Sequence, residues 1–184
     1  MTRALVPLAD GSEELEAVAI IDTFRRARWE VVAAAVKPGP VTASRGVKII
    51  PDASWDDVDP MSFDLMVVPG GSRGVDNLIK DKRVLAAIRQ LYDAGKLVAA
   101  VCAGPLVLQE AGVLDGKRAT CHPDVAAKLT KAKLLDEVVV TDGNIMTSQG
   151  AGTSVEFALA IVARVESHAK ANEVARGMAV PGRG

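Results

Sequence analysis

The sequence predicts an α/β fold in which helices cover a mainly parallel β-sheet. Short apolar runs with the character of strands alternate with stretches of helical spacing along the 184 residues, as in successive βαβ units. Hydrophobic residues make up 49% of the chain but aromatic residues only 3%. The core must therefore be aliphatic, which is typical of a parallel sheet buried on both faces. The length suits one domain, predicted over residues 1–180, without repeats or linkers.

The first half of the chain shows this alternation clearly. Residues 10–27 open with the turn residues Asp10 and Gly11 and continue with apolar residues at helical spacing, which predicts a helix. Gly95 ends a later helix, because glycine readily adopts the left-handed conformation found there. The predicted order is a strand at 3–9, a helix at 10–27, a strand at 29–36, a loop with short strands at 38–52, a strand at 63–71 and a helix at 82–95.

The second half repeats the pattern and adds a hairpin. Asp142 and Gly143 join two apolar runs and are a strong hairpin signal. Thr153 is placed to cap the amphipathic helix that follows. The predicted order is a strand at 96–101, a helix at 104–111, a turn and short helix at 121–132, two strands within 137–148, helices at 152–165 and 167–178, and a frayed Gly/Pro/Arg tail.

Charge and cysteine content narrow the class of protein. The net charge of −1 gives no general attraction to nucleic acid or anionic lipid, and leaves only a local basic patch as an option. Two cysteines, Cys102 and Cys121, are too few for a disulfide scaffold. The N-terminus lacks the apolar region of a signal peptide, and no stretch is apolar enough to span a membrane. We expect a cytoplasmic protein with reduced thiols.

The segment LVAAVCAGPL, residues 97–106, carries the strongest chemical signal. Cys102 ends a buried strand and begins a turn into a helix, which is the geometry of a nucleophile elbow. Free amides at this turn and the helix N-terminus favour the thiolate, so we expect a lowered pKa for Cys102; a fall from about 8.5 to about 6 would leave roughly 90% thiolate at pH 7. The alternative is structural, since cysteine also ends a buried strand as a small hydrophobe.

Two glycines follow the neighbouring predicted strand. The amides of Gly70 and Gly71 could stabilise an oxyanion formed beside Cys102, or the two glycines could form an ordinary turn. They are not part of a phosphate-binding loop, because no Gly-Lys-Ser/Thr follows.

Two further titratable residues are candidates for proton transfer. His122 lies in a predicted loop, where it could act as a general base or pair with a thiolate, or could simply be solvated. Glu16 lies on a largely apolar helix face. If buried it would have a raised pKa and could donate to a thiolate or shuttle a proton; the alternative is a solvated helix surface.

The sequence predicts no metal and no cofactor. Cys121 and His122 are adjacent, which makes them awkward co-ligands, and no CxxC or HxxxH motif supplies further ligands. The glycines of TSQGAGTS, residues 147–154, lack the GxGxxG spacing of a dinucleotide site.

Taken together, these segments resemble the ThiJ/PfpI superfamily, and within it the parkinsonism-associated deglycase and glyoxalase III-like branch with its chaperone-like bacterial members. Each segment is weak alone, but together they are specific and span nearly the whole chain. The resembling segments are RALVPLADGSEELEAV, SRGVKIIPDAS, FDLMVVPGG, VAAVCAGP, CHP and TSQGAGTSVEFALAIV.

The resemblance implies a flavodoxin-like three-layer sandwich that forms a homodimer. It implies that Cys102 is an oxidisable nucleophile, that Glu16 is a protonated acid beside the sulfur, and that His122 lies nearby. It places Gly70, Gly71 and the amide of Ala103 at the oxyanion site, and Arg26 and Arg45 near the dimer interface, where they help to bind anions.

Two departures from the family pattern matter. The further cysteine that relatives often carry in the segment matching residues 43–50 is absent, which excludes redox sensing through that thiol. No clear acid follows His122 to complete a Cys-His-acid triad, which weakens a peptidase interpretation.

Three functions are therefore considered. The first is a cofactor-independent glyoxalase or protein deglycase, acting on methylglyoxal, glyoxal adducts or glycated proteins through a Cys102 thiolate in carbonyl and oxidative stress. The second is a redox-responsive chaperone or stress sensor, in which Cys102 is oxidised to a sulfinate. The third is a cysteine peptidase or amidotransferase-like hydrolase.

Overall fold

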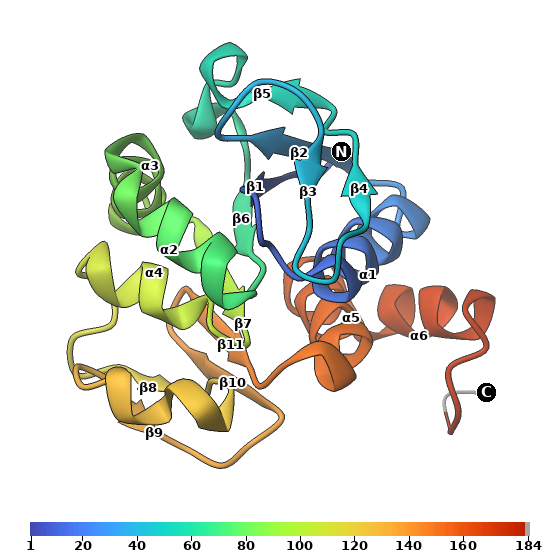
Figure 1. The fold of residues 1–184 in the computed structure, drawn as a ribbon. Coiled ribbons are helices and arrows are strands. Elements are labelled where there is room, and N and C mark those ends of the chain that lie inside the picture. The colour runs from blue at the N-terminus through green and yellow to red at the C-terminus, as the bar shows by residue number, and fades with distance from the viewer. Residues whose placement is uncertain (183–184) are drawn as a thin grey trace.

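The computed structural model describes residues 1–182 and has the expected α/β architecture (Figure 1). Its main sheet has seven strands in the order β10-β11-β7-β6-β1-β2-β5. All neighbouring pairs are parallel except the β10–β11 hairpin, so the predictions of a mainly parallel sheet and of a turn at Asp142-Gly143 are confirmed. The strands are β1 (Arg3–Leu8), β2 (Glu30–Ala35), β5 (Ala53–Ser54), β6 (Leu65–Val68), β7 (Leu97–Val101), β10 (Val139–Asp142) and β11 (Ile145–Ser148).

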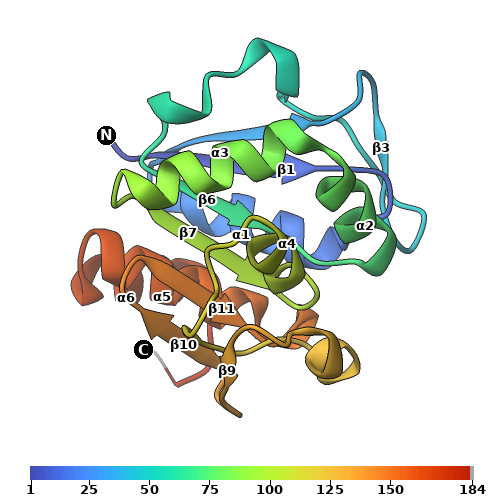
Figure 2. The same cartoon turned by 90° about the vertical axis from the view of Figure 1, so that its left-hand side faces the viewer.

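Helices cover both faces of this sheet and make the three predicted layers (Figures 1 and 2). Helices α2, α3 and α4 pack on one face, and α1, α5 and α6 on the other. The helices are α1 (Glu14–Arg26), α2 (Ser72–Lys80), α3 (Lys82–Asp93), α4 (Pro105–Glu110), α5 (Ser154–Val165) and α6 (His168–Gly177). None of the helices within residues 1–182 is long and apolar enough to cross a membrane.

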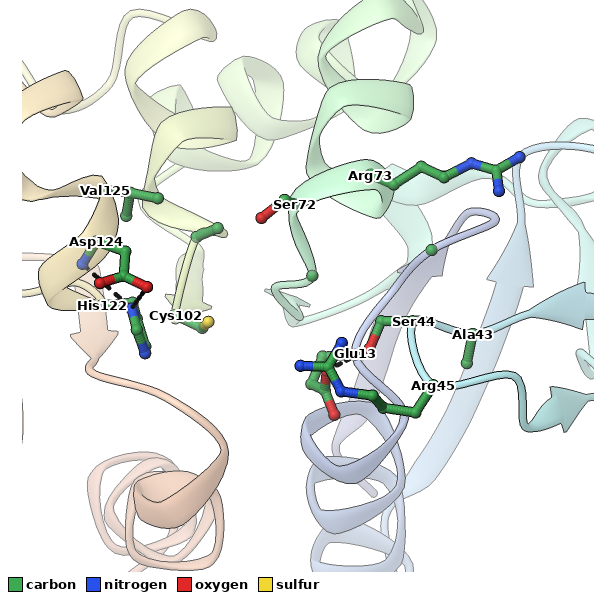
Figure 3. Close-up of a pocket in the computed structure, with 13 residues that line it drawn as sticks. Glu13, Ala43, Ser44, Arg45, Ser72, Arg73, Cys102, His122, Asp124 and Val125 are labelled. Atoms are coloured by element: carbon green, nitrogen blue, oxygen red, sulfur yellow. Dashed lines mark hydrogen bonds and ion pairs between the residues drawn. The ribbon is translucent and has the colours of Figure 1, made fainter.

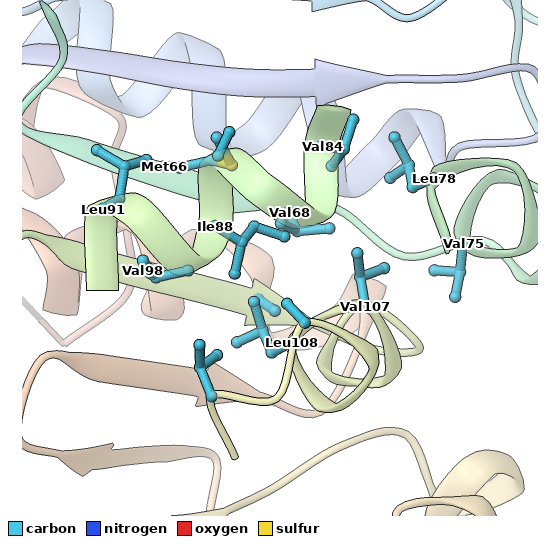
Figure 4. Close-up of a cluster of buried hydrophobic side chains, with 14 of the residues drawn as sticks. Met66, Val68, Val75, Leu78, Val84, Ile88, Leu91, Val98, Val107 and Leu108 are labelled. Atoms are coloured by element: carbon cyan, nitrogen blue, oxygen red, sulfur yellow. The ribbon is translucent and has the colours of Figure 1, made fainter. Parts of the chain in front are cut away.

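The core is divided by the sheet into two aliphatic clusters. Successive residues of β1 face opposite sides, so Leu5 packs with α2–α4 whereas Ala4 and Val6 pack with α1, α5 and α6. Figure 4 shows the first cluster, in which Ile88 and Leu108 reach toward the strands. This packing fixes β6 and β7 as rigid neighbours at the centre of the sheet.

Three local predictions need correction. Helix α2 follows the glycines directly, in a segment for which the sequence predicts no helix. The short helix predicted at 121–132 is a 3-10 helix, η3 (Pro123–Lys128), followed by β9 (Lys133–Leu134), which pairs with β8 (Arg118–Ala119). Thr153 does precede α5, but its hydroxyl does not cap that helix and donates to the Gly150 carbonyl instead.

The remaining elements are short. Strands β3 (Val41–Thr42) and β4 (Lys48–Ile49) form an antiparallel ribbon separate from the main sheet, which confirms the short strands expected in residues 38–52. Three further 3-10 helices are η1 (Trp55–Asp57), η2 (Pro60–Ser62) and η4 (Ala151–Thr153). The end of the tail predicted to fray, residues 183–184, lies outside the described residues.

Candidate active site

Cys102 lies in a strained turn between β7 and α4. Its φ angle is 63°, in the left-handed region that non-glycine residues avoid at a cost of about 1–2 kcal/mol. Two backbone hydrogen bonds fix the turn. The Cys102 amide donates to the Ser148 carbonyl at 3.0 Å, and the Cys102 carbonyl accepts from the His122 amide at 2.9 Å. A strained residue at a strand–turn–helix junction is the geometry of a nucleophile elbow, as the sequence predicts.

Two backbone amides face the sulfur of this half-buried cysteine. The amides of Gly71 and Ala103 donate toward the thiol and favour its ionised form. Gly71 has a φ angle of 87°, and a Cβ atom there would lie 2.2 Å from the Gly11 carbonyl oxygen, so only glycine fits. The amides of Gly71 and Ala103 therefore lie beside the sulfur of Cys102.

The amide of Gly70 is predicted to stabilise an oxyanion, but in the structure it binds Glu16. Its amide donates to Glu16 Oε2 at 2.6 Å, so it is not free to stabilise an oxyanion. It also has to be glycine, because a Cβ atom would lie 2.6 Å from the Cβ of Cys102 and 2.8 Å from Glu16 Oε2. Gly70 is thus the spacer that lets the acid and the thiol approach each other.

Glu16 is completely buried, which rules out the solvated-surface alternative. Burial raises the pKa of Glu16 to about 7, against the opposing hydrogen bonds from Gly70 and Cys102. Its Oε1 atom has no hydrogen-bond partner of ordinary geometry among the described residues. A proton on this carboxyl group would therefore be available to the thiolate or to a substrate beside it.

The expected fall in the pKa of Cys102 is wrong for the thiol beside an ionised Glu16. Burial is the largest cause and the negative charge of Glu16 the second largest, and together they raise the pKa of Cys102 to about 12. The amides of Gly71 and Ala103 act in the opposite direction but do not prevail. The sequence shows the turn and its amides, but it does not show how far the neighbouring acid is buried.

The carboxylate of Glu16 disfavours ionisation of Cys102, so the two groups titrate as a coupled pair: the first proton leaves near pH 7 and the second is retained until about pH 12. The single proton can be on the sulfur or on the carboxyl group. Only the second arrangement gives a thiolate, and it is stabilised by Gly71, Ala103 and the acid proton itself. A thiolate at Cys102 at neutral pH therefore requires a neutral Glu16 beside it.

Gly70→Ala provides a steric test of this arrangement. We expect the added methyl group to push Cys102 and Glu16 apart, to destabilise the fold by about 1–3 kcal/mol and to slow alkylation of Cys102 at least about tenfold. The matched control is Gly152→Ala, because a Cβ atom there meets nothing within 4 Å. Thermal unfolding and the rate of iodoacetamide labelling measure the two effects, and equal labelling rates in both variants would contradict this role of Gly70.

His122 lies beside Cys102 on the pocket wall, but its Nδ1 atom is already an acceptor (Figure 3). The Asp124 amide donates to Nδ1 at 3.2 Å, so the imidazole caps η3. A neutral ring that accepts at Nδ1 carries its proton on Nε2. His122 in this state is a hydrogen-bond donor through Nε2 and not a ready base.

Asp124 corrects the expectation that no acid accompanies His122. Its Oδ2 atom lies 3.7 Å from Nδ1, yet the side chain is 87% exposed. In a catalytic triad the acid accepts a hydrogen bond from the Nδ1–H group of the histidine, whereas here Nδ1 itself accepts a hydrogen bond from the Asp124 amide. The geometry therefore does not favour the peptidase alternative.

A pocket of about 350 Å³ opens above the sulfur, and Figure 3 shows its walls. Cys102, His122 and Asp124 lie on one wall. Glu13, which precedes α1, and Arg45, in the turn between β3 and β4, face them. The lining residues are Gly11, Glu13, Ala43, Ser44, Arg45, Gly71, Ser72, Arg73, Cys102, Ala103, His122, Asp124 and Val125.

The two arginines predicted to bind anions do not lie together in the folded chain. Arg45 lines the pocket, whereas Arg26 ends α1, pairs with Asp22 at 2.6 Å and lies away from the pocket. Sequence inspection missed Glu13 and Ser44, although both lie within segments that carry the family resemblance. Their hydrogen bond to each other depends on folding of the ribbon onto α1 and has no local signal.

Comparisons with known proteins identify the family and the fold. Residues 2–164 match the DJ-1/PfpI family. Protein DJ-1 homolog B of Arabidopsis thaliana is 42% identical over 96% of this chain, although the chain spans only 41% of that relative's length. The glutathione-independent glyoxalase DJR-1.2 of Caenorhabditis elegans is 36% identical over 92% of this chain and 91% of its own length. The crystal structure of Drosophila melanogaster DJ-1beta has a TM-score of 0.94, with 39% identity over 97% of this chain and 98% of its own.

Proposed function

The chain belongs to the DJ-1/PfpI family, and from that premise we propose that it is a cofactor-independent glyoxalase that converts methylglyoxal to lactate through Cys102. The observation that carries the proposal is the pairing of a fully buried acid, Glu16, with a strained and accessible thiol. The name of the glyoxalase relative supports the same reaction class.

The first step is attack on the aldehyde. The thiol proton moves to Glu16 while the Cys102 sulfur forms a bond to the aldehyde carbon, and the resulting oxyanion takes up a proton as the hemithioacetal forms. The amides of Gly71 and Ala103, which face the sulfur, are placed to stabilise the negative charge that develops there. A half-buried sulfur at the floor of a 350 Å³ pocket leaves room for a three-carbon dicarbonyl.

The second step is an internal redox change that needs no external electron acceptor. A base removes the proton from the former aldehyde carbon while the neighbouring ketone oxygen gains one, which gives an enediol. The former ketone carbon then gains a proton as the hydroxyl on the former aldehyde carbon loses one, which gives a 2-hydroxy thioester. Glu16, ionised after donating its proton, is the base beside the sulfur, and a pKa of about 7 suits it to both roles. Water then cleaves the thioester, which releases lactate and restores the thiol.

Lactate formation in the absence of glutathione tests the proposal. The purified protein should produce lactate from methylglyoxal at a rate proportional to protein concentration, as followed by NMR. The Cys121→Ser variant serves as the control for the second thiol, which is buried outside the pocket. Production no faster than in buffer alone would exclude the glyoxalase. Removal of adducts from glycated peptides, measured with free methylglyoxal trapped, would extend the activity to deglycation.

A redox role is the second candidate, since the same contacts would stabilise an oxidised sulfur. Gly71, Ala103 and a protonated Glu16 can all donate to sulfinate oxygens at Cys102, whereas Cys121 is buried without such donors. Mild peroxide followed by intact-mass analysis should modify Cys102 before Cys121. Equal modification of both thiols would argue against a sensor.

We also propose a homodimer, because α1 and the ribbon expose an apolar face. Leu15, Val18, Val47 and Ile50 are 58%, 51%, 52% and 83% exposed. Sedimentation should therefore give twice the chain mass of 19.2 kDa, and a monomer at micromolar concentration would exclude it.

A further inference from the structure

A second cavity lies beyond the carboxyl end of β2, on the face of the sheet that carries α2 and α3 (Figure 1). Its volume of about 510 Å³ is typical of a small-molecule site, and ligands of open parallel sheets bind beyond the carboxyl ends of the strands. It shares no lining residue with the pocket above Cys102, and none of its lining residues lies on α1 or in the β3–β4 ribbon, where the dimer face is proposed. The lining residues are Val36, Lys37, Asn77, Lys80, Asp81, Lys82 and Arg83.

Arg83 and the acids beside it form a fixed wall of this cavity. The Arg83 guanidinium donates to Asp81 at 2.5 and 2.9 Å and also binds Asp56. It donates further to the Val36 carbonyl at 3.1 Å, which joins the end of β2 to the junction of α2 and α3. Asp81, the one acid among the lining residues, is therefore already neutralised by Arg83.

Three lysines of the cavity have no counter-ion. The side chains of Lys37, Lys80 and Lys82 are exposed, and their ammonium groups form no ion pair within the described residues 1–182. Lys37 lies two residues after β2, Lys80 ends α2 and Lys82 begins α3. A cleft lined with charge of one sign focuses the electrostatic field. The cavity is therefore a local basic site on a chain whose net charge is −1.

Lys82 occupies a position that is unfavourable for a cation. The N-terminus of a helix carries a partial positive charge, so an acid in the first turn stabilises the helix and a cation destabilises it. Helix α3 has no acid in its first turn and begins with Lys82 and Arg83. Asp81 caps the helix by accepting from the Arg83 amide at 3.0 Å, but the same carboxylate is held by the Arg83 side chain. The charge of Lys82 thus destabilises α3 until an anion binds beside it.

We propose that this cavity binds a triphosphate chain, either as inorganic polyphosphate or as part of a nucleoside triphosphate, with Lys37, Lys80 and Lys82 as its ligands. A lysine binds phosphate oxygens as a point charge, and three lysines suit an anion with several adjacent charges. No aromatic side chain is among the lining residues for a base to stack on, so the phosphates provide the recognition. The site is independent of the proposed aldehyde chemistry.

Calorimetric titration with sodium tripolyphosphate and with ATP at low ionic strength tests the site. The wild type should bind one triphosphate chain per subunit. Lys80→Gln should weaken binding about tenfold, as expected for the loss of one charge-assisted hydrogen bond. Lys133→Gln is the matched control, because Lys133 is an exposed lysine of β9 outside the cavity, and it should leave the affinity unchanged. Equal affinities for the two compounds identify the phosphate chain alone as the ligand, and tighter binding of ATP identifies the nucleotide.

Lys82→Glu separates binding from folding, because its two expected effects have opposite signs. Tripolyphosphate binding should weaken at least about tenfold, since a cation is replaced by an anion. The melting temperature without ligand should rise by about 2–4 °C, because a negative charge then lies at the N-terminus of α3. Loss of binding through misfolding would instead lower the melting temperature.

Four results would overturn the inference. The first is the absence of tripolyphosphate binding by the wild type, and the second is an unchanged affinity in both Lys80→Gln and Lys82→Glu. The third is protection of Cys102 from iodoacetamide by tripolyphosphate, which would place the anion in the pocket above the sulfur. The fourth is equally tight binding of a hexaglutamate peptide, which would show a general attraction to acidic groups. The glyoxalase proposal is unaffected by any of these results, since none of them measures lactate.

Discussion

Replacing Cys102 with serine should reduce glutathione-independent lactate formation by at least about a thousandfold, because a covalent mechanism has no substitute for its nucleophile. A serine hydroxyl is a far weaker acid than a thiol, so Glu16, with its pKa of about 7, cannot ionise it. The fold should be unaffected, since the oxygen replaces a half-buried sulfur in the same turn. The measurement is lactate production per mole of protein at pH 7.

The second cysteine of the chain provides the control for this prediction. Cys121 is the other thiol, buried and outside the pocket, so Cys121→Ser should retain most of the activity. If Cys102→Ser kept more than about a tenth of the wild-type rate, another residue would have to be the nucleophile.

Glu16→Gln should greatly lower the activity and, above neutral pH, raise the stability of the fold. Activity should fall about 100-fold or more, because glutamine cannot take the thiol proton or return it. Stability above neutral pH should rise, because the variant no longer buries a carboxylate that ionises. The pKa of about 7 lies above the ordinary 4.5, and the difference corresponds to about 3 kcal/mol between the two protonation states.

The sign follows from proton binding. The folded protein binds this proton more tightly than the unfolded chain does, so the contribution of Glu16 to stability is complete below about pH 4.5 and is lost as the pH rises through about 7. The melting temperature of Glu16→Gln should therefore exceed that of the wild type by roughly 6–12 °C at pH 8.5. The difference should shrink at pH 5. A wild type that melts above the variant at pH 8.5 would show that Glu16 is not a buried acid of raised pKa.

The fold was largely readable from the sequence because its signals are local. The apolar runs of β1, β6 and β7 and the spacing within α1 identify a covered parallel sheet, and Asp142-Gly143 identifies the hairpin. Helix α2 was missed because its first turn contains Ser72, Arg73 and Gly74, which resemble the continuation of a glycine loop. The signal that indicates this helix is the spacing of Val75, Leu78 and Ile79, which pack into the cluster shared with α3 and α4.

The sequence allowed most residues of the site to be predicted, but not their ionisation. Cys102 and Gly71 follow from the ends of adjacent strands, which must meet at one edge of the sheet. The burial of Glu16 and the hydrogen bond from the Gly70 amide to it arise from contacts between segments that are distant in the sequence. For this reason the sequence suggested an acidic thiol, whereas the folded site is a pair that shares one proton.

The pH dependence of Cys102 alkylation, in the wild type and in Glu16→Gln, tests this shared proton most directly. The neutral reagent iodoacetamide should be used in a Cys121→Ser background. In the wild type the rate should rise through an inflection near pH 7, as the pair loses its first proton, and then reach a plateau. In Glu16→Gln that inflection should be absent, and the rate should keep rising into the alkaline range like that of an isolated buried thiol. Identical profiles in the two proteins would contradict the account.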